Sequence, residues 1–113
     1  MTGTLAGGPV VALTTVASQD DAERIARSLV EKGLAACVNI VPGVVSIYRW
    51  KDGIERDQEW LLVIKTRGER FAALKTALIA EHPYELPELV ALPIAAGHQP
   101  YLDWLDAAVN FSA

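Results

Sequence analysis

The stretch VNIVPGVVSIYRWKDGIERDQEWLLVIKT, residues 38–66, gives the clearest indication of the fold. Valine, isoleucine and aromatic residues dominate both halves, as is typical of strands, and the letters KDG lie between them as a turn signal. We therefore predict two long antiparallel strands, 36–50 and 54–66, joined as a hairpin. Proline has no N–H to donate to a strand ladder, so Pro42-Gly43 predicts a bulge or kink in the first strand.

The loop of this hairpin can be predicted from the charges beside it. If residues 51–53 form a three-residue loop with Gly53 at a positive φ, Arg49 lies opposite Glu55, an attractive pair. A two-residue loop would place Arg49 opposite Arg56, a repulsive pair. The charges therefore favour the three-residue loop.

The residues before the hairpin predict a strand and then a helix. The run VVALTTV, residues 10–16, is short, apolar and rich in β-branched residues, as is typical of a buried strand. Ser18 and Asp21 resemble a capping box, which starts a helix. Apolar residues then recur with helical spacing over 22–30, and Gly33 suits the end of the helix.

The residues after the hairpin predict a helix, a strand and a terminal helix. Phe71, Leu74 and Leu78 lie on one helical face, and the helix ends near His82 because the following proline favours an extended residue before it. The segment LPELVALPI contains a short strand flanked by prolines, which suits the edge of a sheet. The segment HQPYLDWLDAAV predicts the last helix, with a proline in its first turn.

The order strand-helix-strand-strand-helix-strand, followed by a terminal helix, is the pattern of an α+β, ferredoxin-like fold. Right-handed crossovers then predict an antiparallel sheet with strand order 4-1-3-2, or its mirror, and both main helices on one face. The 113 residues correspond to one domain. We assign 9–113 to this domain and expect the small residues of 1–8 to be flexible.

Composition excludes several classes of partner. The net charge of −4 argues against nucleic acid and against an anionic membrane surface, which both attract basic proteins. No apolar run reaches the length of a transmembrane helix, and the first basic residue, Arg24, comes too late for a secretory signal. The single cysteine, Cys37, cannot form an internal disulfide and is expected in the core. We therefore predict a cytoplasmic protein.

The hairpin is too long for the domain that carries it. Strands of ~12 residues extend ~40 Å, whereas a compact chain of this length has a radius of gyration of about 13 Å. We expect the hairpin to overhang its domain as an arm, and its apolar side chains to pack on another copy of the chain. These side chains are Ile47, Tyr48, Trp50, Ile54 and Trp60. The alternative is a short arm that bends at Pro42 and folds its rings back onto its own sheet.

Few residues suggest chemistry. No nucleophile–base pair is visible, and no paired His or Cys spacing predicts a closed zinc site, so we expect no enzymatic activity. His82 lies at a helix end beside Glu81, where it suits a capping role or, in a symmetric oligomer, a metal ligand. Glu59 and Lys65 share one strand face, and a cleft with an acid, a base and aromatic walls would suit a small polar ligand.

Several segments together resemble one family. They are EKGLAACVNIVPGVVSIYRWKDGI (31–54), Glu59, IKT (64–66), HPYELPEL (82–89), LPI (92–94) and YLDWL (101–105). In this order, over about residues 10–109, they resemble the CutA family of divalent-cation tolerance proteins. The resemblance implies that 9–113 is a single CutA-like domain, that three copies form a homotrimer, and that long hairpins extend onto neighbouring subunits.

The resemblance also implies function and sites. It implies a response to divalent metal ions, or alternatively a signalling module that binds a small ligand between subunits, as PII-type proteins of similar architecture do. The implied intersubunit cleft comprises Tyr48, Trp50, Glu59, Lys65, Tyr84 and Glu88. The implied trimer interface comprises Ile47, Trp50, Ile54 and Trp60.

This chain departs from the family members that bind copper. Those members have a cysteine where this chain has Thr14, and a histidine pair where this chain has Glu81-His82. A carboxylate favours harder ions than a thiolate does. The resemblance therefore implies weaker binding of Cu(II), Zn(II) or a similar divalent cation through His82 and Glu81, and no other cofactor.

Overall fold

The computed structural model describes residues 5–109 of the chain. Its elements are β1 (Pro9–Val16), α1 (Gln19–Glu31), β2 (Cys37–Trp50), β3 (Gly53–Arg67), the 3-10 helix η1 (Gly68–Arg70), α2 (Phe71–Glu81), β4 (Val90–Pro93) and α3 (Gln99–Val109). The first half of the segment predicted to be flexible, 1–4, and the end of the predicted domain, 110–113, lie outside the described residues. None of the described helices combines the length and apolar composition needed to cross a membrane.

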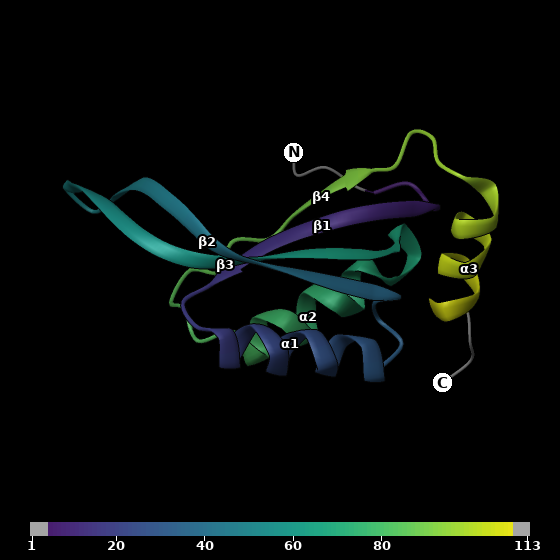
Figure 1. The fold of residues 1–113 in the computed structure, drawn as a ribbon, viewed down its shortest axis with the longest axis horizontal. Helices are drawn as coiled ribbons and strands as arrows, with labels where there is room; N and C mark the ends of the chain where they lie inside the picture. Colours follow the sequence, from purple (N-terminus) through teal and green to yellow (C-terminus); the bar gives the residue numbers. More distant parts are fainter. Residues whose placement is uncertain (1–4, 110–113) are drawn as a thin grey trace.

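The four strands form one antiparallel sheet in the order β2-β3-β1-β4. This is the predicted order 4-1-3-2 seen from the opposite edge, so the ferredoxin-like α+β fold is confirmed. Helices α1 and α2 lie side by side on one face of the sheet, and α3 packs at the end of the sheet away from the hairpin tip (Figure 1).

The core lies between the sheet and helices α1 and α2. It consists of every second residue of β1 and β3 together with one face of each helix, as the two periodicities predict. The buried members of the cluster are Ala12, Val16, Ala22, Ile25, Leu29, Ala35, Leu62, Ile64, Leu74 and Leu78.

Local signals determine the ends of α1 as predicted. Ser18 Oγ accepts a hydrogen bond of 3.1 Å from the Asp21 N–H, which satisfies a free donor of the first turn. Gly33 follows the helix with a φ of 69°, a left-handed conformation that glycine adopts without strain. Helix α2 ends at its C-cap, His82, because Pro83 favours an extended residue before it.

The predicted bulge in β2 is confirmed. The register between β2 and β3 shifts between Val41 and Val44, and Gly43 has a φ of 76°. The two residues of β2 that lie inside the shift, Pro42 and Gly43, face a single residue of β3. The missing proline N–H and the freedom of glycine explain why the ladder breaks there.

The predicted hairpin loop is wrong. The loop has two residues, Lys51 and Asp52, with Trp50 opposite Gly53, and the positive φ of 55° belongs to Lys51. Arg49 therefore lies opposite Ile54, not opposite Arg56 as expected for a two-residue loop, so the repulsive pair that argued against this loop does not form. An exposed charge pair contributes too little to decide a register. The observed register instead separates apolar from acidic side chains onto opposite faces, which the three-residue loop would mix.

The hairpin projects as an arm, which we define as residues 44–59. Pairing between β1 and β3 ends at Val16 and Trp60, and beyond that point β2 and β3 pair only with each other. The arm makes the molecule 44 Å long and raises the radius of gyration to 14.5 Å (Figure 1). Trp60 packs against the core at the base of the arm, rather than on the projecting part.

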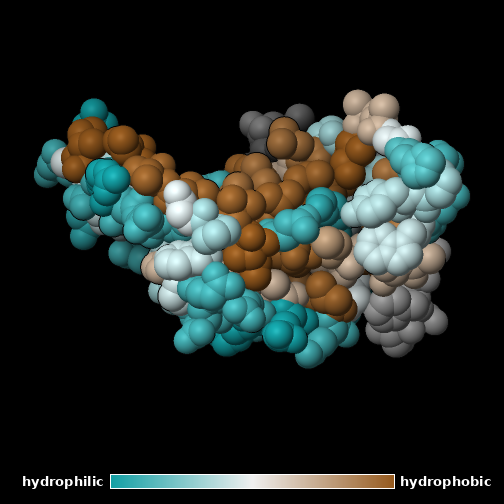
Figure 2. All heavy atoms as spheres, in the orientation of Figure 1, coloured by the Kyte–Doolittle hydropathy of each residue, from teal (hydrophilic) through white to brown (hydrophobic). Residues whose placement is uncertain are grey.

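The two faces of the arm differ in character. Residues directly opposite each other share a face, so Val45, Ile47 and Ile54 lie on one face. Ile47 is 69% exposed and Ile54 is 63% exposed. Figure 2 shows apolar residues along the upper edge of the arm and hydrophilic residues along its lower edge. In the single chain, the arm thus exposes branched apolar side chains to solvent on the face that also carries Arg49, Arg56 and Gln58.

Cys37 is half-buried, whereas the sequence predicted a core position. It lies opposite Lys65, which alternates along β3 with the buried residues Ile64 and Thr66. Cys37 and Lys65 therefore lie on the sheet face that α1 and α2 do not cover, and this explains the exposure of the thiol.

Candidate functional site: an acidic cleft beside the arm

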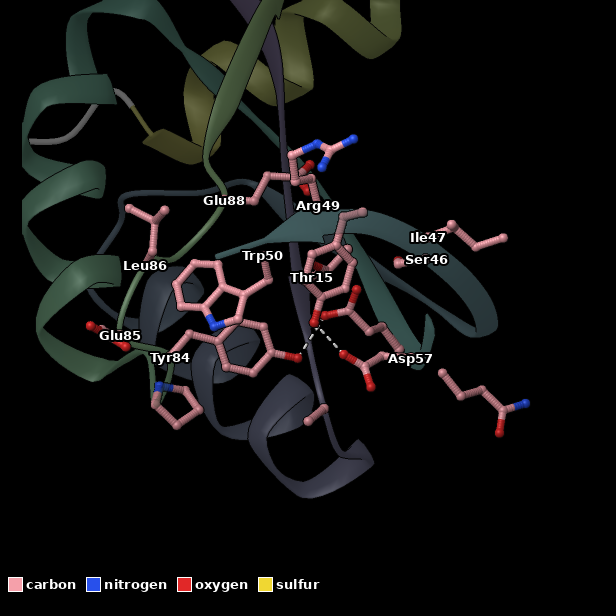
Figure 3. A pocket seen from close by; sticks show the side chains of 15 residues that line it. Thr15, Ser46, Ile47, Arg49, Trp50, Asp57, Tyr84, Glu85, Leu86 and Glu88 are labelled. Carbon is pink, nitrogen blue, oxygen red and sulfur yellow. Dashed lines mark hydrogen bonds between the residues drawn. The ribbon is translucent and has the colours of Figure 1, made fainter. Parts of the chain in front are cut away.

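A cleft of about 840 Å³ lies between the acidic face of the arm and the segment 83–88, which follows α2 (Figure 3). Five residues of the predicted cleft line it, namely Tyr48, Trp50, Glu59, Tyr84 and Glu88. The sixth, Lys65, lies further along β3 and donates a hydrogen bond to Asn39 instead. One chain therefore brings most of the predicted cleft residues together.

Tyr84 and Glu59 form the central contact of the cleft. The Tyr84 hydroxyl donates a hydrogen bond of 2.6 Å to Glu59 Oε2, and the Glu59 residue is only 6% exposed. Burial and this hydrogen bond raise the pKa of Tyr84 above its usual value. The phenol therefore keeps its proton at neutral pH and acts as the donor.

A second tyrosine–carboxylate pair lies on the arm itself. The Tyr48 hydroxyl donates a hydrogen bond to Asp57 Oδ2, which raises the pKa of Tyr48 to about 12. The side chains of Tyr84 and Asp57 point toward each other across the cleft, and dashed lines mark the hydrogen bonds in Figure 3. Two phenols and two carboxylates thus converge at one place.

His82 supports the segment that carries Tyr84. The Tyr84 N–H donates to His82 Nδ1 at 3.1 Å, so Nδ1 carries no proton. His82 Nε2 then donates to the Thr15 carbonyl oxygen at 2.8 Å. The ring is 7% exposed and meets the Tyr84 ring edge-on at 4.7 Å. His82 therefore ties the loop to β1 and orients Tyr84.

The two residues predicted to bind metal point to different partners. Glu81 accepts a hydrogen bond of 2.7 Å from Ser28 on α1 and lies 3.4 Å from Lys32, the residue that follows this helix. Both nitrogens of His82 are occupied within the chain. Residues 5–109 contain no group of three or more His, Cys, Asp or Glu side chains placed to hold a metal ion.

Thr14, the position at which copper-binding relatives have a cysteine, lies in the core. It is fully buried, and its Oγ1 has no hydrogen-bond partner among residues 5–109. The neighbouring residue Thr15 lines the cleft. The alternation of β1 therefore directs Thr14 away from the candidate site.

Sequence reasoning missed Asp57 as a site residue. The sequence feature that could have identified it is the alternation of Glu55, Asp57 and Glu59, which places three carboxylates on one face of a strand. Asp57 was overlooked because an acidic strand face is usually a solvated surface. Its position in the lining of the cleft and its contact with Tyr48 assign it to the site.

The fold and the cleft define a small ferredoxin-like protein with a projecting hairpin and a pocket at the base of that hairpin. The family model described as CutA1 divalent ion tolerance protein matches residues 10–108. The chain belongs to this family.

The sequences of known relatives align with most of this chain. The divalent-cation tolerance protein CutA of Thermus thermophilus is 57% identical over 95 residues, which cover 84% of this chain and 92% of that protein. Human protein CutA is 45% identical over 103 residues, which cover 91% of this chain and 58% of the human protein. The chain therefore spans little more than half the length of the human relative.

Solved structures of relatives have the same fold. The T. thermophilus divalent cation tolerance protein has a TM-score of 0.84 at 56% identity, covering 86% of this chain and 94% of that chain. CutA1 from Oryza sativa has a TM-score of 0.89 at 41% identity, covering 97% of this chain and 100% of that chain.

Proposed function

We propose that the chain is a cytoplasmic divalent-ion response protein that works as a homotrimer, with each arm packed on a neighbouring subunit. The exposed isoleucines of the arm carry this proposal, because Ile47 and Ile54 are 69% and 63% exposed in the single chain. Apolar area left in water costs ~25 cal/mol per Å², and such patches mark interfaces. The names of the relatives support the link to divalent ions.

The solution mass tests the assembly. Light scattering should give three times the chain mass of 12.2 kDa. The double variant Ile47→Ser, Ile54→Ser should shift the mass toward the monomer, because it removes apolar contacts from the interface. Ile79→Ser is the matched control, since Ile79 is an exposed isoleucine on α2. A monomeric wild type, or a double variant that stays trimeric, would contradict the proposal.

Metal binding at His82 and Glu81 has less support than the assembly does. A metal at His82 would have to displace either the Tyr84 N–H or the Thr15 carbonyl. We therefore expect weak binding of Cu(II) or Zn(II). Calorimetric titration of wild type and His82→Gln tests the assignment, with His98→Gln at the exposed second histidine as control. Equal affinity in wild type and His82→Gln would remove His82 as a ligand.

A second candidate function is a small-ligand-binding module. The cleft of about 840 Å³ favours it, since ligand sites are typically pockets of this size with a few convergent polar groups. Saturating ligand adds a few kcal/mol to the free energy of unfolding, so a bound compound should raise the melting temperature by several degrees. A screen of small polar compounds in which none raises it by more than about 1 °C would count against this function.

A further inference from the structure

Glu59 is a buried acid without a basic partner. Its only hydrogen-bond partner in the described part of the chain is the Tyr84 hydroxyl, which binds Oε2. The other oxygen, Oε1, has no partner in this part of the chain. In residues 5–109, Thr14 Oγ1 is the only fully buried side-chain oxygen or nitrogen without a partner, so Glu59 Oε1 is not fully buried. The open oxygen of a residue that is 6% exposed therefore belongs to the lining of the cleft.

The charge of Glu59 is not balanced within the chain. No ion pair joins it to Lys, Arg or His among residues 5–109. A phenol supplies a hydrogen bond but no positive charge, and a buried carboxylate without a counter-charge is costly. Asp57 adds a second carboxylate, and Arg49, the single basic residue of the lining, pairs with neither. In the single chain, the cleft therefore favours a cation.

The geometry favours an organic cation over a metal ion. Divalent ions need several converging oxygen ligands, but residues 5–109 contain no suitable group of three. Each of the two carboxylates already accepts a tyrosine hydroxyl on one oxygen. The two phenol rings supply aromatic surface, which attracts organic cations. The volume of about 840 Å³ admits a molecule larger than a hydrated ion.

We propose that this cleft binds a small organic ammonium ion, whose charged group lies at Glu59 Oε1 and Asp57 and whose carbon skeleton packs against Tyr48 and Tyr84. This inference rests on the ligand-binding function proposed above as the second candidate, and it specifies the class of ligand.

A matched series of compounds tests the class. Diaminobutane, butanediol and succinate share a four-carbon skeleton and are cationic, neutral and anionic at neutral pH, and ethanolamine adds a singly charged amine. Binding to the full chain is measured by calorimetry at fixed ionic strength, with magnesium chloride and copper(II) chloride titrated separately. We expect the two amines to bind and the diol and succinate not to bind.

Two variants test the residues. Glu59→Gln keeps the shape of the side chain and should weaken amine binding by at least about tenfold, because it removes a charge-assisted hydrogen bond. Asp57→Asn, at an exposed position of the arm, should also weaken binding. Glu31→Gln, at an exposed glutamate at the end of α1, is the control and should bind as wild type does.

Each other outcome overturns the inference in a distinguishable way. If the diol or succinate binds as tightly as the amines, or if Glu59→Gln and Asp57→Asn bind amines as wild type does, the cleft function survives and the cationic class is wrong. If no compound binds wild type, both the ligand-binding function of the cleft and the cationic class of its ligand are wrong. If Glu59→Gln lowers the solution mass of the assembly, a neighbouring subunit supplies the counter-charge and the ligand is unnecessary.

Discussion

The Tyr84 hydroxyl lies 2.6 Å from Glu59 Oε2 and ties the loop after α2 to the base of the arm. Tyr84→Phe removes this hydrogen bond and leaves a buried carboxylate without a partner. We expect the free energy of unfolding to fall by about 1–3 kcal/mol, measured by urea denaturation. Tyr101→Phe, at an exposed tyrosine of α3, is the control and should change it by less than about 0.5 kcal/mol. Equal stability of Tyr84→Phe and wild type would contradict the role assigned to the contact.

His82 uses both ring nitrogens to hold the same loop, so its replacement should cost more. His82→Leu leaves the Tyr84 N–H and the Thr15 carbonyl oxygen without partners, and we expect a loss of about 2–4 kcal/mol in urea denaturation. His98→Leu, at an exposed histidine, should change stability little. If the two variants were equally stable, the hydrogen bonds of His82 would contribute nothing to the fold.

Two buried threonines should respond in opposite ways to the same substitution. Thr14→Val removes a hydroxyl that has no partner, and we expect no loss of stability or a gain of up to about 1 kcal/mol. Thr66→Val removes a hydroxyl that donates to the Leu34 carbonyl oxygen at 2.7 Å, and should cost about 1–2 kcal/mol. Both residues are fully buried, so each serves as the control for the other. Equal losses in thermal and urea unfolding would refute the distinction.

Glu69 should contribute a stability that depends on pH. Its carboxylate accepts hydrogen bonds from Arg67 and from the Gly8 N–H, and these lower its pKa from 4.5 to about 2. Because the folded pKa lies below the unfolded one, the contribution is present above pH 4.5 and is lost as the pH falls toward 2. Glu69→Gln should therefore be less stable than wild type at pH 7, and the difference should shrink on acidification.

Urea denaturation at several pH values between 7 and 2 measures this difference. Glu31→Gln, at an exposed glutamate, is the control. A difference between Glu69→Gln and wild type that stays constant with pH would mean that folding does not lower the pKa of Glu69.

The parts of the fold that could be predicted depend on local chemistry. The Ser18 cap, the Gly33 stop and the bulge at Pro42-Gly43 all follow from backbone requirements of one or a few neighbouring residues, and the structure confirms each. The predicted hairpin loop was wrong because a two-residue loop places Arg49 opposite Ile54 and not opposite Arg56, so the repulsion that argued against it does not arise. The separation of apolar from acidic side chains over the whole arm decides that register.

The site could be predicted only in part. Tyr84 and Glu59 were both identified, but their hydrogen bond depends on where the loop after α2 crosses the end of β1. Adjacent position in the sequence suggested that Glu81 and His82 act together. The helix end directs Glu81 toward α1 and His82 toward β1, so their side chains separate.

By itself, the sequence determined the elements, their order and the family, because caps, turns and hydrophobic periods act over a few residues. Only the tertiary structure decided which oxygen of Glu59 has a partner, which ring nitrogen of His82 carries the proton, and which face of the arm carries the isoleucines. These properties arise from contacts between residues far apart in the chain. Such contacts depend on strand register and on loop path, which local preferences leave open.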